Sequence, residues 1–114
     1  LAGEIQDEIL NGSVIAAEEV LKSYLELFGD DFYLEYQTNT MQEQDTYNKK
    51  IIRLSEKYNI ETVITSDSHY AVKSDSKWHK YWVSIQKENN EYYSTPDYWI
   101  YGESDVYKIM QGRV

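Results

Sequence analysis

A strand, a helix and a second strand follow one another between residues 32 and 66, and this order constrains the fold more than any other feature. The aromatic run at residues 32–36 and the apolar run at residues 62–66 have high β-propensity. Between them, apolar side chains recur at helical intervals over residues 43–58. A strand–helix–strand unit of this length places its strands parallel. The sequence therefore predicts an α/β fold with parallel strands near 32–36 and 62–66, the second of them buried.

Amphipathic helices are predicted on both sides of this unit. One runs over residues 13–28, with Ser13 as its N-cap and Gly29 at its end, and a short helix over residues 4–10 precedes it. Another runs over residues 75–87, and its apolar stripe consists of Trp78, Tyr81, Trp82 and Ile85. We expect this stripe to be core rather than a base-stacking platform, although neighbouring lysines (Lys73, Lys77 and Lys80) leave a minor DNA contact open. A short strand over 98–101 and a helix over 104–111 are expected to follow.

Size and charge limit what the chain can do alone. Its 114 residues can bury one modest core. Twenty Asp and Glu against eleven Lys and Arg give a net charge of −9. Residues 1–45 hold eleven acids and one base, Lys22, and are therefore at −10. An acidic surface repels phosphate backbones, so we expect no free-standing nucleic-acid binding.

The absence of Cys and of any long apolar run excludes further classes of protein. The chain has no Cys, which excludes a disulfide framework and a thiolate metal site within it. No apolar run approaches the roughly 18 residues that a membrane span needs. We therefore expect a soluble, cytoplasmic protein with no membrane partner.

The clearest chemical signal is Asp67-Ser68-His69, directly after the second predicted strand. Residues two apart at a strand end point to the same side, and parallel strands carry functional groups at their carboxyl ends. A carboxylate beside an imidazole suits zinc, manganese or iron. The alternative is a loop-capping Asp67 next to an ordinary His69, because two ligands alone do not hold a catalytic metal.

Four blocks carry a family resemblance. They are Leu1-Ala2-Gly3-Glu4-Ile5, then Phe28-Gly29-Asp30-Asp31-Phe32-Tyr33-Leu34-Glu35, then Thr65-Ser66-Asp67-Ser68-His69-Tyr70, and then Asp75 with His79. Together they resemble the bacterial replicative DNA polymerase III alpha subunit of the DnaE type, in the later part of its N-terminal PHP (polymerase and histidinol phosphatase) domain. The resemblance implies a partial PHP-type (β/α)7 barrel. We expect residues 1–88 to be the C-terminal part of that barrel and residues 89–114 an extension towards the following polymerase region.

The resemblance also implies a metal site. The last metal motif of the barrel has the form D-x-H, which Asp67 and His69 match, while Ser66 replaces the usual Asn. A Cys and several His and acidic ligands of the family would lie upstream of the first block, whose start reads as the middle of a sequence. We expect a divalent metal (Zn, Mn, Mg or Fe) in the intact parent and a fragment that is inactive alone.

Two other residues near these blocks have simpler interpretations. Glu35 could point to the barrel mouth, but a salt bridge or an edge position is favoured. His79 follows Asp75 by one helical turn, so a side-chain pair is favoured over metal ligation.

The function implied for the parent is DNA replication, with DNA and other replisome subunits as partners. Its PHP domain would carry out metal-dependent phosphoester hydrolysis or 3′–5′ exonuclease proofreading, and nucleotidyltransferase activity would belong to a palm outside this chain. One alternative is a non-catalytic scaffold that braces the polymerase and docks a proofreading subunit. Another is an unrelated acidic α/β domain. Apolar surface left exposed on a partial barrel predicts that the fragment self-associates.

Overall fold

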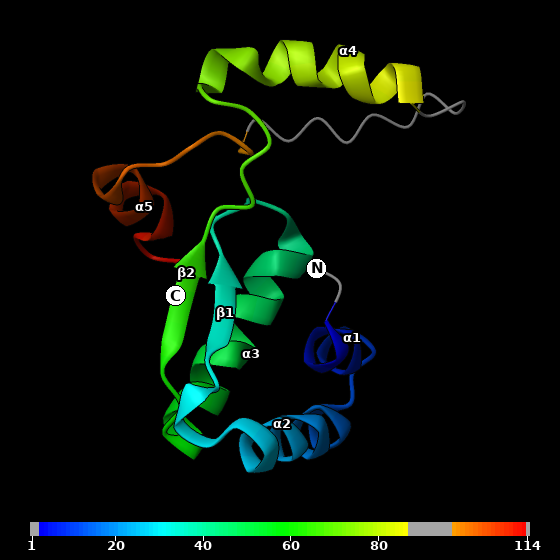
Figure 1. The fold of residues 1–114 in the computed structure, drawn as a ribbon, viewed down its shortest axis with the longest axis vertical. Coiled ribbons are helices and arrows are strands. Elements are labelled where there is room, and N and C mark those ends of the chain that lie inside the picture. Colours follow the sequence, from blue (N-terminus) through cyan, green and yellow to red (C-terminus); the bar gives the residue numbers. More distant parts are fainter. Residues whose placement is uncertain (1–2, 87–96, 114) are drawn as a thin grey trace.

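The computed structural model describes residues 3–86 and 97–113 (Figure 1). The elements in chain order are α1 (Glu4–Leu10), α2 (Val14–Phe28), η1 (Gly29–Asp31), β1 (Leu34–Gln37), α3 (Gln42–Tyr58), β2 (Thr62–Thr65), η2 (Lys73–Asp75), α4 (Ser76–Gln86) and α5 (Glu103–Met110). The helices predicted over 4–10, 13–28, 43–58, 75–87 and 104–111 are confirmed as α1 to α5, with small shifts at their ends. The domain boundary expected near residue 88 lies outside the described residues and stays a prediction.

The two strands pair in parallel, as the strand–helix–strand order predicts. Leu34 lies opposite Thr62, and Gln37 lies opposite Thr65. β1 begins two residues later than expected, because the Phe32 backbone N–H donates to the Gly29 oxygen and ends η1; the Phe32 ring packs against Tyr24 of α2, with centroids 5.8 Å apart. Within the described residues the sheet has these two strands, which establishes a parallel α/β arrangement. The seven-stranded barrel stays a prediction.

The core lies between the sheet, α3 and the first two helices. α3 covers one face of the sheet (Figure 1) and contributes Ile51, which is fully buried, and Leu54. Leu34 of β1 meets them from the sheet, and Ile9 of α1 and Leu21 of α2 complete the same cluster. The strand–helix–strand unit and the α1–α2 pair therefore share one hydrophobic core.

The helix ends follow the local signals in the sequence. The Ser13 hydroxyl accepts a hydrogen bond of 3.2 Å from the Ala16 backbone N–H and caps α2, as predicted. Asn59 adopts the left-handed conformation, with φ 52° and ψ 49°, and ends α3. Asn is one of the few residue types other than Gly that tolerate this region, which explains why α3 stops there and β2 can begin.

The expectation that β2 is buried is wrong for its outward-facing residues. Val63 is 43% exposed. The register pairs Val63 with Glu35, so both side chains lie on the face of the sheet opposite to the one that buries Leu34. α3 lies on the other face of the sheet (Figure 1).

The expectation that the aromatic stripe of α4 enters the core is also wrong. None of the α4 residues is buried, and Figure 1 shows α4 at the opposite end of the molecule from α1 and α2. The radius of gyration is 15.9 Å, against about 13 Å for a compact domain of some 100 residues. Helical periodicity predicted an apolar face correctly, but it does not specify what covers that face. Within the described part of the chain, no helix is long and apolar enough to cross a membrane.

Two leucines of α2 test this core directly. Leu21 is fully buried, whereas Leu27 is 71% exposed. We expect Leu21→Ala to lower the free energy of unfolding by about 2–5 kcal/mol, through lost burial and the cavity left behind. Leu27→Ala should stay within about 0.5 kcal/mol of the parent chain. Urea unfolding followed by far-UV circular dichroism measures both, and equal losses would contradict this placement of α2.

Candidate functional site

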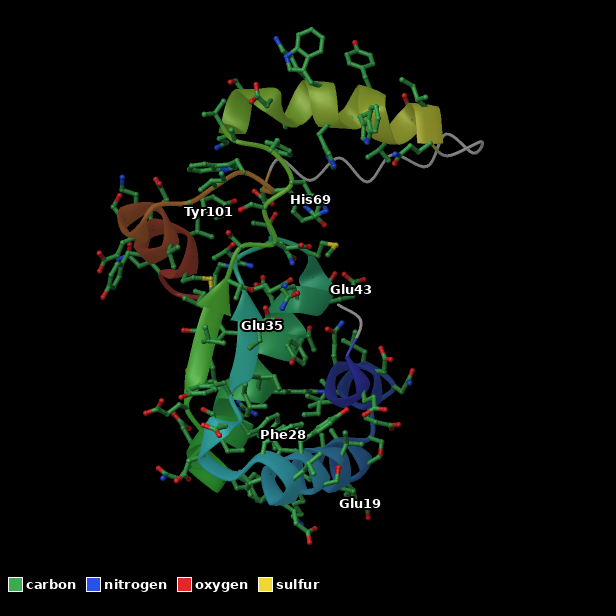
Figure 2. All side chains as sticks on the ribbon, viewed as in Figure 1. Glu19, Phe28, Glu35, Glu43, His69 and Tyr101 are labelled. Atoms are coloured by element: carbon green, nitrogen blue, oxygen red, sulfur yellow. The ribbon has the colours of Figure 1, made fainter. Side chains whose placement is uncertain are left out.

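The candidate site lies where the two parallel strands end. Because β1 and β2 run in the same direction, the polar segments that follow Gln37 and Thr65 leave the sheet at the same edge. Figure 2 places His69 between this edge and α4. The strand–helix–strand geometry therefore brings the candidate residues to the carboxyl ends of the two strands.

Asp67 and His69 are brought together, as predicted, by a turn rather than by a regular strand. Asp67 has a positive φ of 45°, a region that non-Gly residues adopt uncommonly and that Asp tolerates better than most. Its backbone oxygen lies 2.7 Å from the Nδ1 atom of His69, and its Oδ1 atom lies 4.0 Å from the same nitrogen. Both side chains are about half exposed. The turn fixes one face of the His69 ring and leaves the site open to solvent.

This geometry suits a metal ligand in one respect and is incomplete in another. A carbonyl oxygen can only accept, so the short contact assigns a proton to Nδ1 of His69, and in the neutral ring the lone pair is then on Nε2. A ligating His commonly has its other nitrogen held in this way. In residues 3–86 and 97–113, however, no three His, Cys, Asp or Glu side chains form a group that could hold an ion. The donors fit a divalent metal and fall short of a complete site.

Aromatic rings and backbone groups support His69 on the side of residues 97–101. The His69 backbone N–H donates to the backbone carbonyl oxygen of Tyr98 at 2.6 Å, and the rings of His69 and Tyr98 lie 4.6 Å apart between centroids. Tyr70 forms an isolated parallel bridge with Trp99, and this bridge stands in place of the strand expected over 98–101. The segment 97–101 therefore acts as a backing for the Asp67–His69 turn.

His79 extends this cluster from α4. Its ring lies 5.3 Å from the ring of His69 and 5.3 Å from that of Tyr70. Burial, and to a lesser degree the neighbouring His69, lower the pKa of His79 below its ordinary value of 6.5. The structure thus places His79 among rings at the site.

Glu35 accepts a hydrogen bond of 2.6 Å from the Thr65 hydroxyl across the strand pair.

A buried amide network closes the end of β1, and sequence reasoning missed it. The backbone N–H of Leu34 donates to the Glu61 oxygen, directly before β2, and that of Thr38 donates to the Thr65 oxygen in β2. The backbone groups of Gln37 therefore point away from β2. Both are met by the side chain of Asn48 in α3: Gln37 N–H donates to Oδ1 at 3.2 Å, and Nδ2 donates to the Gln37 oxygen at 2.8 Å. Gln44 donates to the same Oδ1 at 2.8 Å. A signal was present, because Gln44 and Asn48 continue the inward stripe of α3 at helical spacing.

Arg113 ties the last described residues to the same place. Its guanidinium donates to the backbone oxygens of Thr38 at 2.9 Å and Asn39 at 2.5 Å, and to the carboxylate of Asp45 at 2.5 Å. These contacts join positions 68 to 75 residues apart, so no local pattern predicts them. Among the described residues, the buried Thr38 hydroxyl has no hydrogen-bond partner. The loop after β1 is therefore held from both α3 and the C-terminal segment.

Two concave surfaces of the described chain lie away from Asp67 and His69. One, of about 340 Å³, lies between α1, α2 and β1 and is lined by Glu4, Glu35 and Tyr47 among others. Burial, and then the charge of Glu35, raise the pKa of Tyr47 to about 12. The other, of about 780 Å³, lies between α5 and the sheet. The candidate ligands are thus on an exposed edge rather than in either hollow.

Comparison with known proteins shows what the chain resembles. Over 70 residues it is 37% identical to the DNA polymerase III subunit alpha of Aquifex aeolicus, covering 61% of this chain and 6% of that protein. The Thermus aquaticus subunit is 31% identical over 107 residues, which cover 94% of this chain and 9% of that protein. The Deinococcus radiodurans subunit is 34% identical over 86 residues, which cover 75% of this chain and 6% of that protein. The chain therefore spans less than a tenth of the length of these relatives.

The relatives share one description across distant bacteria, which confirms the resemblance to this subunit. The alternative of an unrelated acidic α/β domain is thereby wrong. No family model matches the chain.

The amide network gives a stability prediction. Asn48 is fully buried, and Asn48→Ala leaves the backbone N–H and oxygen of Gln37 unpaired. Each unpaired group costs about 1–3 kcal/mol, so we expect a clear fall in the urea midpoint. Asn11→Ala, at an exposed position after α1, is the control and should change stability by less than about 0.5 kcal/mol. Equal midpoints for the two variants would show that the hydrogen bonds of Asn48 do not stabilise the fold.

A further prediction concerns the two histidines, which are the only ones in the chain. In an NMR titration, the imidazole of His79 should titrate below 6.5, and His69→Ala should raise its pKa only in part, because burial is the larger cause. A lowered folded pKa means that the unfolded chain binds the proton more tightly. The stability contribution of neutral His79 is therefore present above pH 6.5 and is lost as the pH falls through the folded pKa. A titration of His79 at or above 6.5 would contradict the packing of its ring.

Proposed function

The chain is related to one segment of the bacterial DNA polymerase III alpha subunit, and we propose that this segment is the later part of the subunit's N-terminal PHP domain. The observation that carries the proposal is the placement of Asp67 and His69 at the carboxyl end of β2, in a parallel strand–helix–strand unit. That unit is a building block of a (β/α) barrel, whose functional groups gather at this end. The order of the four sequence blocks adds to it.

In the intact parent, Asp67 and His69 would be two ligands of a divalent metal cluster of Zn, Mn, Mg or Fe. Such ions polarise a phosphoryl oxygen and lower the pKa of a bound water. The contribution of this chain is orientation: the Asp67 backbone oxygen holds the Nδ1 proton, so Nε2 of His69 presents its lone pair, and Tyr98 backs the ring. The remaining ligands would come from parts of the parent outside these residues.

The parent would use this site in DNA replication, for metal-dependent phosphoester hydrolysis or 3′–5′ exonuclease proofreading. Its location would be the cytoplasm, and its partners would be DNA and other replisome subunits. Nucleotidyl transfer would belong to the palm, outside this chain. With two ligands, the isolated chain would bind metal weakly and would not hydrolyse phosphodiesters.

A second candidate function is a non-catalytic scaffold that braces the polymerase and docks a proofreading subunit. The observation that favours it is that α2 carries exposed apolar side chains near both of its ends, where Ile15 is 78% exposed and Leu27 71% exposed. Surface of this kind marks contacts with other proteins or other parts of a parent. The expected self-association of the isolated chain would use the same surface and stays a prediction.

Zinc titration followed by NMR tests the metal assignment on the purified chain. Zn²⁺ should shift the imidazole resonances of His69, and Asp67→Asn should weaken the affinity about tenfold or more, as even an outer ligand contact contributes that much. His79→Gln is the matched control, because it removes the neighbouring histidine and should keep binding. Shifts confined to His79, or an affinity unchanged by Asp67→Asn, would contradict the assignment.

The same preparation tests whether the site is incomplete. With Mn²⁺ or Zn²⁺ and a phosphodiester substrate, we expect no turnover above that of the metal alone. Turnover that His69→Ala abolishes would show that the chain by itself supplies a working centre, against the proposal that other parts of the parent complete it.

A further inference from the structure

The outer face of α4 carries three exposed aromatic side chains. Trp78, Tyr81 and Trp82 are 60%, 63% and 60% exposed, and we call them the aromatic face of α4. They occupy positions i, i+3 and i+4, so they lie side by side on one surface of the helix. The rings of Trp78 and Tyr81 have centroids 6.1 Å apart. Water-exposed rings grouped in this way indicate a binding surface rather than a core.

The inner face of α4 is the one that contacts the rest of the chain. His79 packs there against the rings of His69, Tyr70 and Tyr98, and Val83, one turn further on, is half-buried. The helix is thus fixed through its inner face, while its aromatic face points elsewhere. Because α4 contributes nothing to the hydrophobic core, changes on its aromatic face should leave folding intact.

Lysines accompany these rings. Lys77 places its Nζ atom 4.9 Å from the centroid of the Trp78 ring. Lys73 lies in η2, directly before the helix. Asp75 is the one acidic residue between positions 70 and 86. The surface therefore combines stackable rings with positive charge.

Much of the negative charge lies away from this place. Six of the eleven acids of residues 1–45 are in α1 and α2, which lie far from α4 in a molecule 43 Å long (Figure 1). Exposed charges are screened over about 8–10 Å at physiological salt. The expectation of no nucleic-acid binding rested on the summed charge, whereas the fold separates the acids of α1 and α2 from the lysines of α4.

We propose that the aromatic face of α4 binds single-stranded nucleic acid, with bases stacking on Trp78, Tyr81 and Trp82 and with Lys73 and Lys77 contacting phosphates. Exposed rings beside cations are the combination that single-strand binding proteins use. A duplex hides the faces of its bases, so these rings could not stack on it. A protein partner fits less well, because lysine is depleted where protein interfaces are enriched in aromatic residues. The binding rests on α4 alone, and its place in replication rests on the proposed function.

Fluorescence anisotropy with a labelled oligothymidylate of about twenty nucleotides tests the proposal on the whole chain. Tyr81→Ala should raise Kd about fivefold or more, since a stacked base contributes at least that much. The matched control is Tyr107→Ala on α5, a tyrosine that is 74% exposed and lies off the aromatic face; it should change Kd less than about twofold. Lys77→Gln should reduce the slope of log K against log salt by about 0.7.

Other outcomes overturn the proposal. The first is that the chain does not bind the oligothymidylate at low salt, and the second is that it binds the matching duplex with equal affinity. The third is that Lys77→Gln lowers the affinity for the oligothymidylate while Tyr81→Ala and Trp78→Ala leave it unchanged. Sedimentation of the free chain is a further check: an oligomer that Trp78→Ala converts to monomer would assign the face to protein contacts instead. All titrations contain EDTA, so the result is independent of the metal test, and either proposal can fail without the other.

Discussion

The packing of α3 across a parallel strand pair is the constraint on which the rest of the structure depends. Ile51 and Leu54 lie on the inward stripe of α3 and bury the sheet from one side, together with Leu34 of β1. A helix in this crossover brings both strands out at one edge. As a result, the loop after Gln37 and the turn at Asp67 become neighbours, although they are far apart along the chain. The candidate site is therefore a consequence of topology.

The inward stripe of α3 changes character along its length. Its later half is apolar and packs in the core, whereas Gln44 and Asn48 in its first half are buried and polar. Asn48 replaces a neighbouring strand at Gln37 by meeting both of its backbone groups, and Arg113 then fastens the loop that follows. Satisfied buried networks of this kind hold one arrangement, because breaking any member leaves others unpaired. Specific hydrogen bonds thus hold the backbone at the strand ends. A purely apolar core would not fix the backbone in this way.

Elements governed by local rules could be predicted from the sequence, and elements governed by distant partners could not. The helices follow from apolar spacing and from Ser13 and Asn59 at their ends, and the parallel strands follow from the crossover length. Asp67 and His69 could be singled out as candidate ligands because both lie in one short motif. Arg113 was missed because its partners are about seventy residues away. Trp78 was misplaced because periodicity identifies an apolar face and contains no information about what covers it.

The two faces of α4 link the candidate metal ligands to the aromatic surface. The inner face meets His69 through His79, and the outer face carries Trp78, Tyr81 and Trp82. A helix with its side chains is about 10–12 Å across, so a strand bound on the outer face would pass within roughly one helix width of the candidate ligands. Phosphoester hydrolysis needs its substrate strand held near the metal. The position of α4 would therefore serve both proposals, although each depends on different residues and can be tested without the other.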